Sequence, residues 1–280
     1  MYTKTFTILM AAAISSTTFA QDVAPPFANT SATPVHFGIL LHSAIQPIDL
    51  FGPLDVLTGL VMSYRNVSRF ELSVLSVNST PAATGSRMGG LDFEFALPPS
   101  ITLAQYRELA ASNFTTDLDE PATCPDKAKI RNKGPIDVLL VPGGGGTRAD
   151  VSNEIDFVKE IYPKLRDIIS VCTGSTILAR AGVLDNKKAT TNKKAWAWAT
   201  TFGTNVDYQT HARWVQDGNV WTGSGVSAAS DTAYAYVAHV FGDQVSQWVA
   251  DSNEYTRWLN ASYDPFADRW GLGKANLAAA

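Results

Sequence analysis

The sequence predicts an α/β domain with a mostly parallel sheet that helices cover on both sides. Three short apolar runs, at 35–41, 137–141 and 168–171, have the composition of strands buried on both faces. Segments with helical apolar spacing alternate with these runs along the chain. Such alternation favours right-handed crossovers between parallel strands, and ligand sites in these sheets lie at the carboxyl ends of the strands.

The first part of the pattern is built from two strands and a helix. The run 35–41 follows Pro34 and ends in polar residues, as a buried strand should, and 70–76 predicts the next strand. Between them, 49–62 predicts a helix because its apolar residues recur every three or four positions. The stretch 91–96 is expected to belong to a hairpin.

The second part repeats the alternation around a glycine-rich loop. The strand 137–141 ends in Pro142 and the run Gly143–Gly146. Beyond it we expect a helix at about 152–166, a strand at 168–171, a helix at 173–181, a hairpin at 213–221 and closing helices at 228–241 and 245–258.

The N-terminus has the pattern of a secretory signal peptide. A basic start, an apolar run at 6–14 and small residues before Gln21 make 1–20 a cleavable signal whose apolar part is too short to span a bilayer. A Pro/Ala/Thr-rich leader, 21–34, follows. Glycosylation acceptor motifs support a eukaryotic secretory route, so we expect a secreted glycoprotein. The acceptors are Asn29, Asn66, Asn78, Asn113 and Asn260.

Length and composition favour one domain and exclude two kinds of partner. Roughly 245 residues remain after the leader, enough for one sizeable core, which we place at 35–270 with a tail at 271–280. The polar stretch 112–135 is predicted to be a surface insertion. A formal charge of −4 gives no basic excess for nucleic acid, and no later segment is long and apolar enough for a membrane helix. We therefore expect neither nucleic acid nor a membrane as a partner.

Cys172 lies where a short apolar strand turns into a helical pattern. The N–H groups and dipole of that helix would lower the thiol pKa from its free value of about 8.5 and could hold an anion that forms beside the sulfur. One alternative is a buried structural thiol. Another is a disulfide with Cys124, the second cysteine, because a cysteine pair in an exported protein is usually bridged. Cys124 lies in the predicted insertion, so we favour a free Cys172.

The glycine run Gly143–Gly146 lets the backbone approach a ligand closely. It lacks the Gly-Lys-Ser/Thr ending of a phosphate loop and the spacing of a dinucleotide fingerprint. A pocket of backbone N–H groups for a developing anion is therefore favoured over a nucleotide site, with a flexible turn as the alternative.

Asp49 stands where the chain bends from the first strand into the first helix. A carboxylate at this place commonly caps the helix through backbone N–H groups. If it instead faces the sulfur of Cys172, it can donate and accept protons during attack at carbon.

Four segments together resemble the DJ-1/PfpI superfamily. They are 49–56, which contains Asp-x-x-Gly-Pro, 138–145, 170–175, which contains Val-Cys-Thr-Gly, and 189–192. Within the superfamily the chain is most similar to the isocyanide (isonitrile) hydratase branch and its fungal relatives, from Val35 to Phe266. The Asp-x-x-Gly-Pro and Val-Cys-Thr-Gly pair is specific, whereas the glycine loop alone is not. The stretches 223–231 and 264–266 also look like that branch.

The resemblance implies a flavodoxin-like fold with Cys172 as the nucleophile on an elbow and Asp49 as its acidic partner. The thiolate would attack an isocyanide carbon, water would resolve the thioimidate to an N-substituted formamide, and Asp49 would move the protons. Gly144, Gly145 and Thr173 would bind the substrate, with the amides of Gly144 and Thr173 and the Thr173 hydroxyl stabilising the developing charge. No metal or organic cofactor is implied. The expected partners are a small-molecule substrate and a second copy of the chain.

The chain also departs from other branches of the superfamily. Peptidase-like members carry a histidine near the position of Asn192, so a Cys–His dyad is not expected. The DJ-1 branch proper usually has Glu as the acid, and Asp49 therefore favours the hydratase branch.

Most other polar side chains are expected at the surface. Of the histidines, only His42 lies near the predicted cleft, and we expect it in an exposed loop. The remaining expectations are His36 within the first strand, His211 and His239 on strand and helix surfaces, and the pairs Lys187-Lys188 and Lys193-Lys194 in solvated turns.

Two functions remain open from the sequence. The first is a cofactor-independent cysteine enzyme of the hydratase or lyase type, with an isocyanide as the leading substrate and another small electrophile of secondary metabolism as the variant. The second is a secreted, non-catalytic, redox-responsive or ligand-binding protein, since an exposed low-pKa thiol is readily oxidised.

Overall fold

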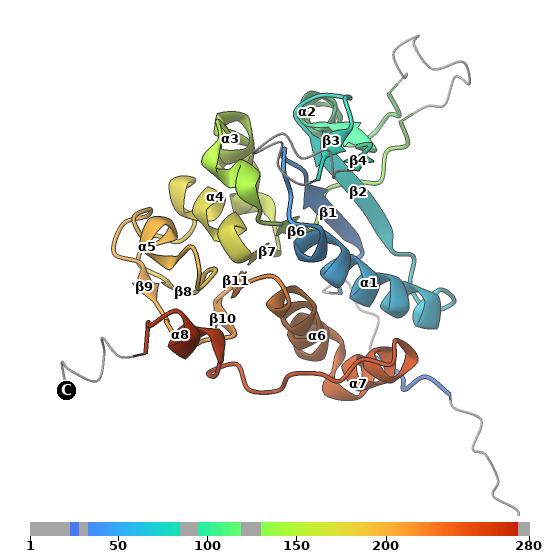
Figure 1. Ribbon diagram of the computed structural model, residues 1–280. Helices are drawn as coiled ribbons and strands as arrows, with labels where there is room; N and C mark the ends of the chain where they lie inside the picture. The colour runs from blue at the N-terminus through green and yellow to red at the C-terminus, as the bar shows by residue number, and fades with distance from the viewer. Residues whose placement is uncertain (1–22, 28–32, 85–94, 119–129, 274–280) are drawn as a thin grey trace, which may run out of the picture.

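A seven-stranded sheet forms the centre of the computed structural model, which describes residues 23–27, 33–84, 95–118 and 130–273 (Figure 1). The strand order is β10-β11-β7-β6-β1-β2-β5. Every neighbouring pair is parallel except β10 with β11. The predicted α/β class with a mostly parallel sheet is confirmed.

The sheet consists of β1 (His36–Leu40), β2 (Glu71–Ser76), β5 (Ile101–Thr102), β6 (Val138–Val141), β7 (Asp167–Val171), β10 (Trp214–Asp217) and β11 (Val220–Gly223). Two small sheets pair β3 (Ala82–Ala83) with β4 (Ala96–Leu97) and β8 (Lys188–Ala189) with β9 (Asp207–Tyr208). The β3–β4 pair bears out the expected hairpin at Ala96, whereas 91–94 lie outside the described residues.

The helices are α1 (Pro47–Tyr64), α2 (Leu103–Ala111), α3 (Ser152–Ile161), α4 (Ser175–Arg180), α5 (Trp196–Ala199), α6 (Ala228–Phe241), α7 (Asp243–Ser252) and α8 (Phe266–Arg269). Three 3₁₀ turns are η1 (Gly145–Arg148), η2 (Tyr162–Lys164) and η3 (Cys172–Gly174). None of the helices in the described part of the chain is long and apolar enough to cross a membrane.

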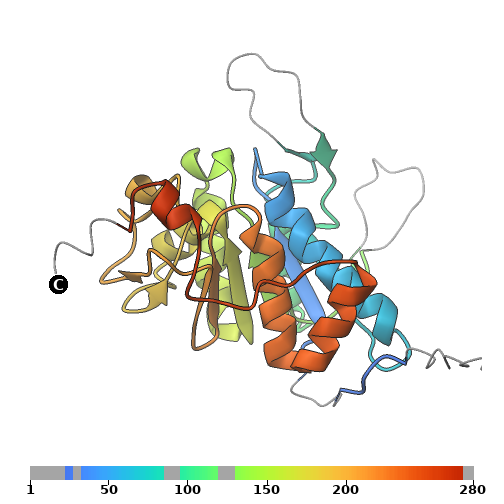
Figure 2. The same cartoon turned by 60° about the horizontal axis from the view of Figure 1, so that its bottom comes forward.

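The helices form a layer on each face of the sheet (Figures 1 and 2). Alternate strand residues point to opposite faces, so Ile39 and Leu140 join the core beneath α1, α6 and α7, while Leu40 and Leu139 join the core beneath α2, α3 and α4. Both faces are therefore buried, which explains the continuous apolar runs of the central strands.

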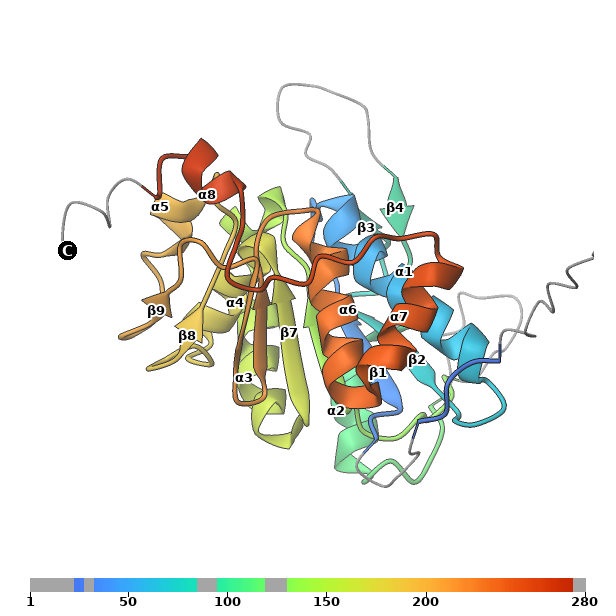
Figure 3. The ribbon, with the colours of Figure 1, turned by 90° about the horizontal axis from the view of Figure 1, so that it is seen from below.

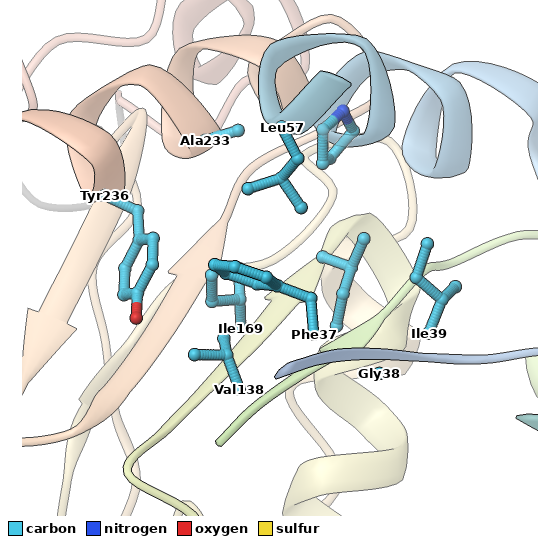
Figure 4. Close-up of a pocket in the computed structure, with 10 residues that line it drawn as sticks. Phe37, Gly38, Ile39, Leu57, Val138, Ile169, Ala233 and Tyr236 are labelled. Atoms are coloured by element: carbon cyan, nitrogen blue, oxygen red, sulfur yellow. The ribbon is translucent and has the colours of Figure 1, made fainter. Parts of the chain in front are cut away.

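The core beneath α1 and α6 is almost completely filled. A void of about 20 Å³ remains between the sheet and these helices, lined by apolar side chains such as Phe37, Leu57 and Ile169 (Figure 4). It is only about large enough for one water molecule and offers no polar partner, so it has no features of a ligand site.

Two predicted helices end early for local reasons. The predicted helix at 152–166 stops at Ile161 because Pro163 follows, and a 3₁₀ turn completes it. The predicted helix at 245–258 stops at Ser252, where Glu254 adopts a φ of 51° and the Tyr255 N–H bonds back to the Ala250 carbonyl. This is a helix-ending geometry.

The chain beyond α7 crosses back over the helical layer of α6 and ends in α8 beside α5 (Figure 3). We call residues 253–273 the C-terminal segment. It is fixed to the sheet by the Arg213 N–H, which donates to the Ala261 carbonyl at 2.7 Å. This segment brings aromatic side chains to the carboxyl end of the sheet, where the candidate site lies.

Candidate active site

Cys172 directly follows β7, at the carboxyl end of the central strands. Its φ is 58°, a left-handed conformation that costs a non-glycine residue roughly 1–2 kcal/mol. The surroundings hold it there: its N–H donates to the Ser224 carbonyl at 2.8 Å, and the hydroxyls of Ser175 and Thr191 donate to its carbonyl at 3.0 and 3.1 Å. Such over-determined strain is common at functional sites.

Three hydrogen-bond donors face the sulfur. The Asn192 side chain places Nδ2 3.2 Å from Sγ, and the backbone N–H groups of Thr173 and Val226 also face the sulfur. Asn192 is oriented by its Oδ1, which accepts from the Ala195 N–H at 2.9 Å. The sequence indicates Asn192 only as the residue that stands where other branches have histidine, so this contact is not predicted, although the Ala189-Thr-Thr motif before Asn192 is a signal for it.

Asp49 lies in the first turn of α1 and is completely buried. Its Oδ2 accepts from the Gly143 N–H at 3.2 Å, and it makes no helix-capping bond, so the capping alternative is wrong. A Cβ on Gly143 would lie 2.8 Å from Asp49 Oδ2 and 2.9 Å from Cys172 Cβ, so only glycine allows the carboxyl and the thiol to approach each other. Within the described residues, Asp49 Oδ1 is buried without an ordinary hydrogen-bond partner.

Burial sets the ionisation of this pair. It raises the pKa of Asp49 to about 7, against the opposing contacts with the Cys172 thiol and the Gly143 amide. Burial, followed by the negative charge of Asp49, raises the pKa of Cys172 to about 12. The predicted lowering of the thiol pKa is therefore wrong, because desolvation and the neighbouring carboxylate outweigh the N–H groups, and α4 is only six residues long.

The two groups titrate as a pair that carries one proton at slightly alkaline pH. With the proton on sulfur, the charge lies on a carboxylate that a single amide faces. With the proton on Asp49, the charge lies on a sulfur that three N–H groups face. A proton transfer from Cys172 to Asp49 thus produces a thiolate in a site built to solvate it, even though the free thiol is a weak acid.

The glycine loop is fixed, which rules out the flexible-turn alternative. The Gln46 N–H donates to the Gly143 carbonyl at 2.9 Å, and Gly144, with a φ of 140°, approaches the Ala44 carbonyl so closely that a Cβ would lie 2.3 Å from its oxygen. The Gly144 N–H donates to Thr173 Oγ1 at 3.0 Å, and this hydroxyl donates to the Gly144 carbonyl at 3.1 Å. The backbone of Gly144 and the hydroxyl of Thr173 thus bind each other. Gly145 is the first residue of the turn η1.

Two polar side chains expected at the surface are buried instead. His42 is 2% exposed, with its ring nitrogens 2.8 Å from the Ser43 carbonyl and 3.0 Å from that of Pro142. Lys193 is 3% exposed, and burial lowers its pKa to about 8. In both cases a backbone carbonyl that only the tertiary fold brings near replaces water. It belongs to Pro142 for His42, and to Ala212, which accepts at 2.9 Å, for Lys193.

A buried ion-pair cluster lies behind the site. Arg213 donates to Asp231 Oδ2 at 2.7 and 2.9 Å and lies 3.6 Å from Asp264, whose other oxygen accepts from the Ser224 hydroxyl. Ser224 is the residue whose carbonyl binds the Cys172 N–H. Neither Asp231 nor Arg213, an isolated arginine in a strand pattern, is predicted from the sequence to belong to the site.

The structure describes four of the five predicted glycosylation acceptors and one of the two cysteines. Asn66, Asn78, Asn113 and Asn260 are all exposed, as glycosylation acceptors must be, and Asn29 lies outside the described residues. Cys172 is a free thiol, and Cys124 also lies outside the described residues.

Known proteins share both sequence and fold with this chain. The DJ-1/PfpI family model matches residues 101–239. The protein named isonitrile hydratase from Pseudomonas putida is 28% identical over 224 residues, which cover 79% of this chain and 78% of that protein.

Two solved structures resemble the whole fold. A ThiJ/PfpI family protein from Pseudomonas syringae has a TM-score of 0.59 at 24% identity, covering 88% of this chain and 86% of its own. Drosophila melanogaster DJ-1beta has a TM-score of 0.56 at 21% identity, covering 80% and 99%. The fold is therefore flavodoxin-like, as expected, and the chain carries a DJ-1/PfpI family domain.

Proposed function

We propose that this chain is a cofactor-independent cysteine enzyme of the hydratase type that converts an isocyanide into an N-substituted formamide. The observation that carries the proposal is the fully buried carboxyl of Asp49, beside the thiol of Cys172, which is held at positive φ. One oxygen of this carboxyl has no ordinary hydrogen-bond partner among the described residues. A strongly perturbed acid next to a nucleophile is typical of a catalytic site. The likeness to the Pseudomonas putida isonitrile hydratase supports this choice of reaction.

In the proposed reaction, Asp49 accepts the thiol proton while the sulfur of Cys172 attacks the isocyanide carbon and forms a C–S bond. Asp49 then gives this proton to the same carbon, which yields a thioimidate. A water molecule adds to the thioimidate carbon, and Asp49 transfers a water proton to the nitrogen. The C–S bond breaks, the remaining hydroxyl proton returns to sulfur, and the formamide leaves. The net change is the addition of one water molecule, without oxidation or reduction.

The N–H groups around the sulfur have a defined task in this scheme. The Asn192 amide and the backbone N–H groups of Thr173 and Val226 stabilise the sulfur whenever it is anionic, before attack and as a leaving group. The Thr173 hydroxyl and the Gly144 amide can serve a substrate only after they part from each other. We therefore assign them to substrate binding rather than to thiolate formation.

Formamide production from phenyl isocyanide by the purified protein tests the proposal. We expect turnover by the wild type, none by Cys172→Ala, and undiminished turnover by Asp55→Asn, which removes an exposed carboxyl from the same helix as Asp49. Absence of product between pH 5 and pH 9, or full activity of Cys172→Ala, would contradict it.

The non-catalytic, redox-responsive alternative has less support. It gives no task to the buried carboxyl of Asp49, which lies beside the thiol and lacks full pairing among the described residues, whereas the hydratase reaction uses this group for proton transfer. A wild-type protein that makes no formamide but forms a sulfenic acid at micromolar peroxide would favour it.

We also propose export, glycosylation and a homodimer. The four exposed acceptor asparagines support glycosylation, which a loss of mass on glycosidase treatment of protein secreted from a eukaryotic host would test. Exposed apolar side chains on α1, at Ile48, Phe51 and Met62, support a second copy as partner. Light scattering of the purified protein would give the mass that tests it.

A further inference from the structure

We propose that a pocket between the Cys172 elbow and the C-terminal segment binds the nitrogen substituent of the substrate, and that this substituent is a flat aromatic ring, favoured when it carries an acidic group. The inference rests on the proposed function and names the substrate class of the same site. The pocket has a volume of about 210 Å³. Since a cavity of about 150 Å³ is enough to bind benzene, a single substituted ring fits.

The pocket adjoins the sulfur through two residues. Asn192 and Val226 both line it, and both direct an N–H group at the sulfur of Cys172. One end of the pocket therefore lies next to the groups that contact the sulfur. Gly225 lets the Asn192 side chain pack closely at this end of the pocket, because a Cβ there would lie 2.7 Å from the Asn192 amide nitrogen.

Aromatic side chains form the outer wall. Phe266 and Trp270 both line the pocket, yet they remain 42% and 47% exposed. Aromatic rings of this size are usually buried or stacked, and a flat ring that enters the pocket would cover them. Their exposure beside an apolar hollow points to an aromatic ligand rather than to a packing role.

A positive charge lies at the rim. Lys194 lines the pocket, and its ammonium is 5.6 Å from the centre of the Trp270 ring. Within the described residues no carboxylate pairs with Lys194, whereas the neighbouring Lys193 is buried and held by carbonyl and hydroxyl groups. An acidic group on the far end of the ring would give Lys194 a partner, and a basic group would be repelled.

The aromatic wall is tied to the nucleophile by one chain of contacts. The Phe266 N–H donates to Asp264 Oδ1 at 3.1 Å, and Asp264 Oδ2 accepts from the hydroxyl of Ser224. The carbonyl of Ser224 in turn holds the N–H of Cys172. The distance from the wall to the sulfur is thus fixed by buried polar contacts, as a specificity pocket requires.

Relative rates for four substrates test the proposal. We compare phenyl with cyclohexyl isocyanide, which differ in flatness, and 4-carboxyphenyl with 4-(trimethylammonio)phenyl isocyanide, which differ in charge. The wild type should prefer the phenyl and carboxyphenyl compounds in kcat/KM. Phe266→Ala and Trp270→Ala should each lower kcat/KM for phenyl isocyanide about tenfold and bring the phenyl-to-cyclohexyl ratio towards one. Lys194→Gln should lower the carboxyphenyl preference about fivefold, and less at high salt.

Matched controls come from the same regions of the chain. Leu259→Ala removes an exposed apolar side chain of the C-terminal segment outside the pocket, and Lys188→Gln removes an exposed lysine elsewhere. Both should keep the wild-type ratios. Unchanged ratios in the Phe266 and Trp270 variants, with both substrates turned over, would overturn the proposal.

A binding measurement separates this inference from the proposed function. N-phenylformamide, the expected product, should bind to Cys172→Ala and quench its tryptophan fluorescence, and the added Trp270→Ala change should weaken binding about tenfold. If the wild type turns over no isocyanide, the proposed function fails; loss of phenylformamide binding in the Trp270 variant would still support the ring pocket. Equal binding by both variants would overturn the pocket.

Discussion

The buried Arg213 cluster contacts Ser224, whereas the buried Asp49 contacts Cys172, and these two sets of charges differ in how completely they are paired. Asp231 accepts from Arg213 at 2.7 and 2.9 Å through one oxygen and from the Tyr255 hydroxyl at 2.7 Å through the other. Asp49 accepts from one amide, and its second oxygen has no ordinary partner among the described residues. The Arg213 cluster satisfies its charges, whereas Asp49 remains in a costly environment.

The difference separates a structural charge from a functional one. Buried charges are tolerated when they are paired and hydrogen-bonded, and removal of one partner leaves the other exposed to a large desolvation cost. A buried carboxyl without full pairing lowers stability, and proteins keep such groups mainly where chemistry needs them. We therefore expect substitutions in the two sets to have opposite effects on activity and stability.

The largest effect should come from Asp49→Asn. We expect kcat for phenyl isocyanide to fall about 10²- to 10⁴-fold, the usual contribution of a proton-transferring group. The urea midpoint should stay unchanged or rise, because the neutral amide is cheaper to bury. Steady-state kinetics and urea unfolding of the same preparation measure both. A fall in stability that parallels the fall in activity would mean that Asp49 has a structural role, like the Arg213 cluster.

Arg213→Met should have the opposite profile. It leaves Asp231 and Asp264 buried without their cation, so the free energy of unfolding should fall by about 3–5 kcal/mol. Urea unfolding followed by tryptophan fluorescence measures this, with Arg166→Met, a half-exposed arginine paired at 3.3 Å, as control. If the free energy of unfolding falls by less than about 1 kcal/mol, as for a surface ion pair, the Arg213 cluster does not differ from Asp49 by a structural role.

The raised pKa of Asp49 predicts how stability depends on pH. The folded carboxyl keeps its proton up to about pH 7, whereas the unfolded one loses it near pH 3.8. The unfolded state thus binds fewer protons in this range, so stability falls as pH rises from about 4 to about 7, by up to about 4 kcal/mol for a shift of about three pH units.

The difference between wild type and Asp49→Asn isolates this contribution. Unfolding free energies should be measured at pH 4, 5.5, 7 and 8. The unfolding free energy of Asp49→Asn relative to that of the wild type should increase up to about pH 7 and stay constant at higher pH. A constant difference throughout would mean that Asp49 ionises normally.

A smaller effect is expected from Asn192→Ala. It removes one of the donors to the sulfur, and we expect kcat to fall about tenfold while Asp49 keeps its titration. Alkylation of Cys172 by iodoacetamide should slow by a similar factor, because less thiolate forms. Asn186→Ala, at an exposed turn, serves as control. Normal alkylation together with lost activity would assign Asn192 to substrate binding alone.

The sequence predicts the sheet and the reactive pair well because both have local signals. The central strands are apolar on both faces, and Asp49 and Cys172 each follow such a strand, so the parallel order brings them to the same edge. The helix α2 was missed although its capping box of Thr102 and Gln105 is visible in the sequence.

The remaining features depend on partners that are distant in the chain. Lys193 and His42 are buried by carbonyls that lie 19 and 100 residues away, and neither distance is encoded in local composition. The thiol pKa was predicted in the wrong direction because burial and the charge of Asp49 depend on tertiary packing, whereas only the helix start is visible in the sequence.

The central claim is that the sulfur of Cys172 bonds to the isocyanide carbon while Asp49 handles the proton. Mass spectrometry of the protein, mixed in excess with phenyl isocyanide and quenched in acid within one turnover, tests it most directly. The account predicts a transient species heavier by one isocyanide, with the added mass on the peptide that contains Cys172 and none on Cys172→Ala. Formamide production with Cys172 unmodified at every time point, or an adduct on another residue, would contradict it.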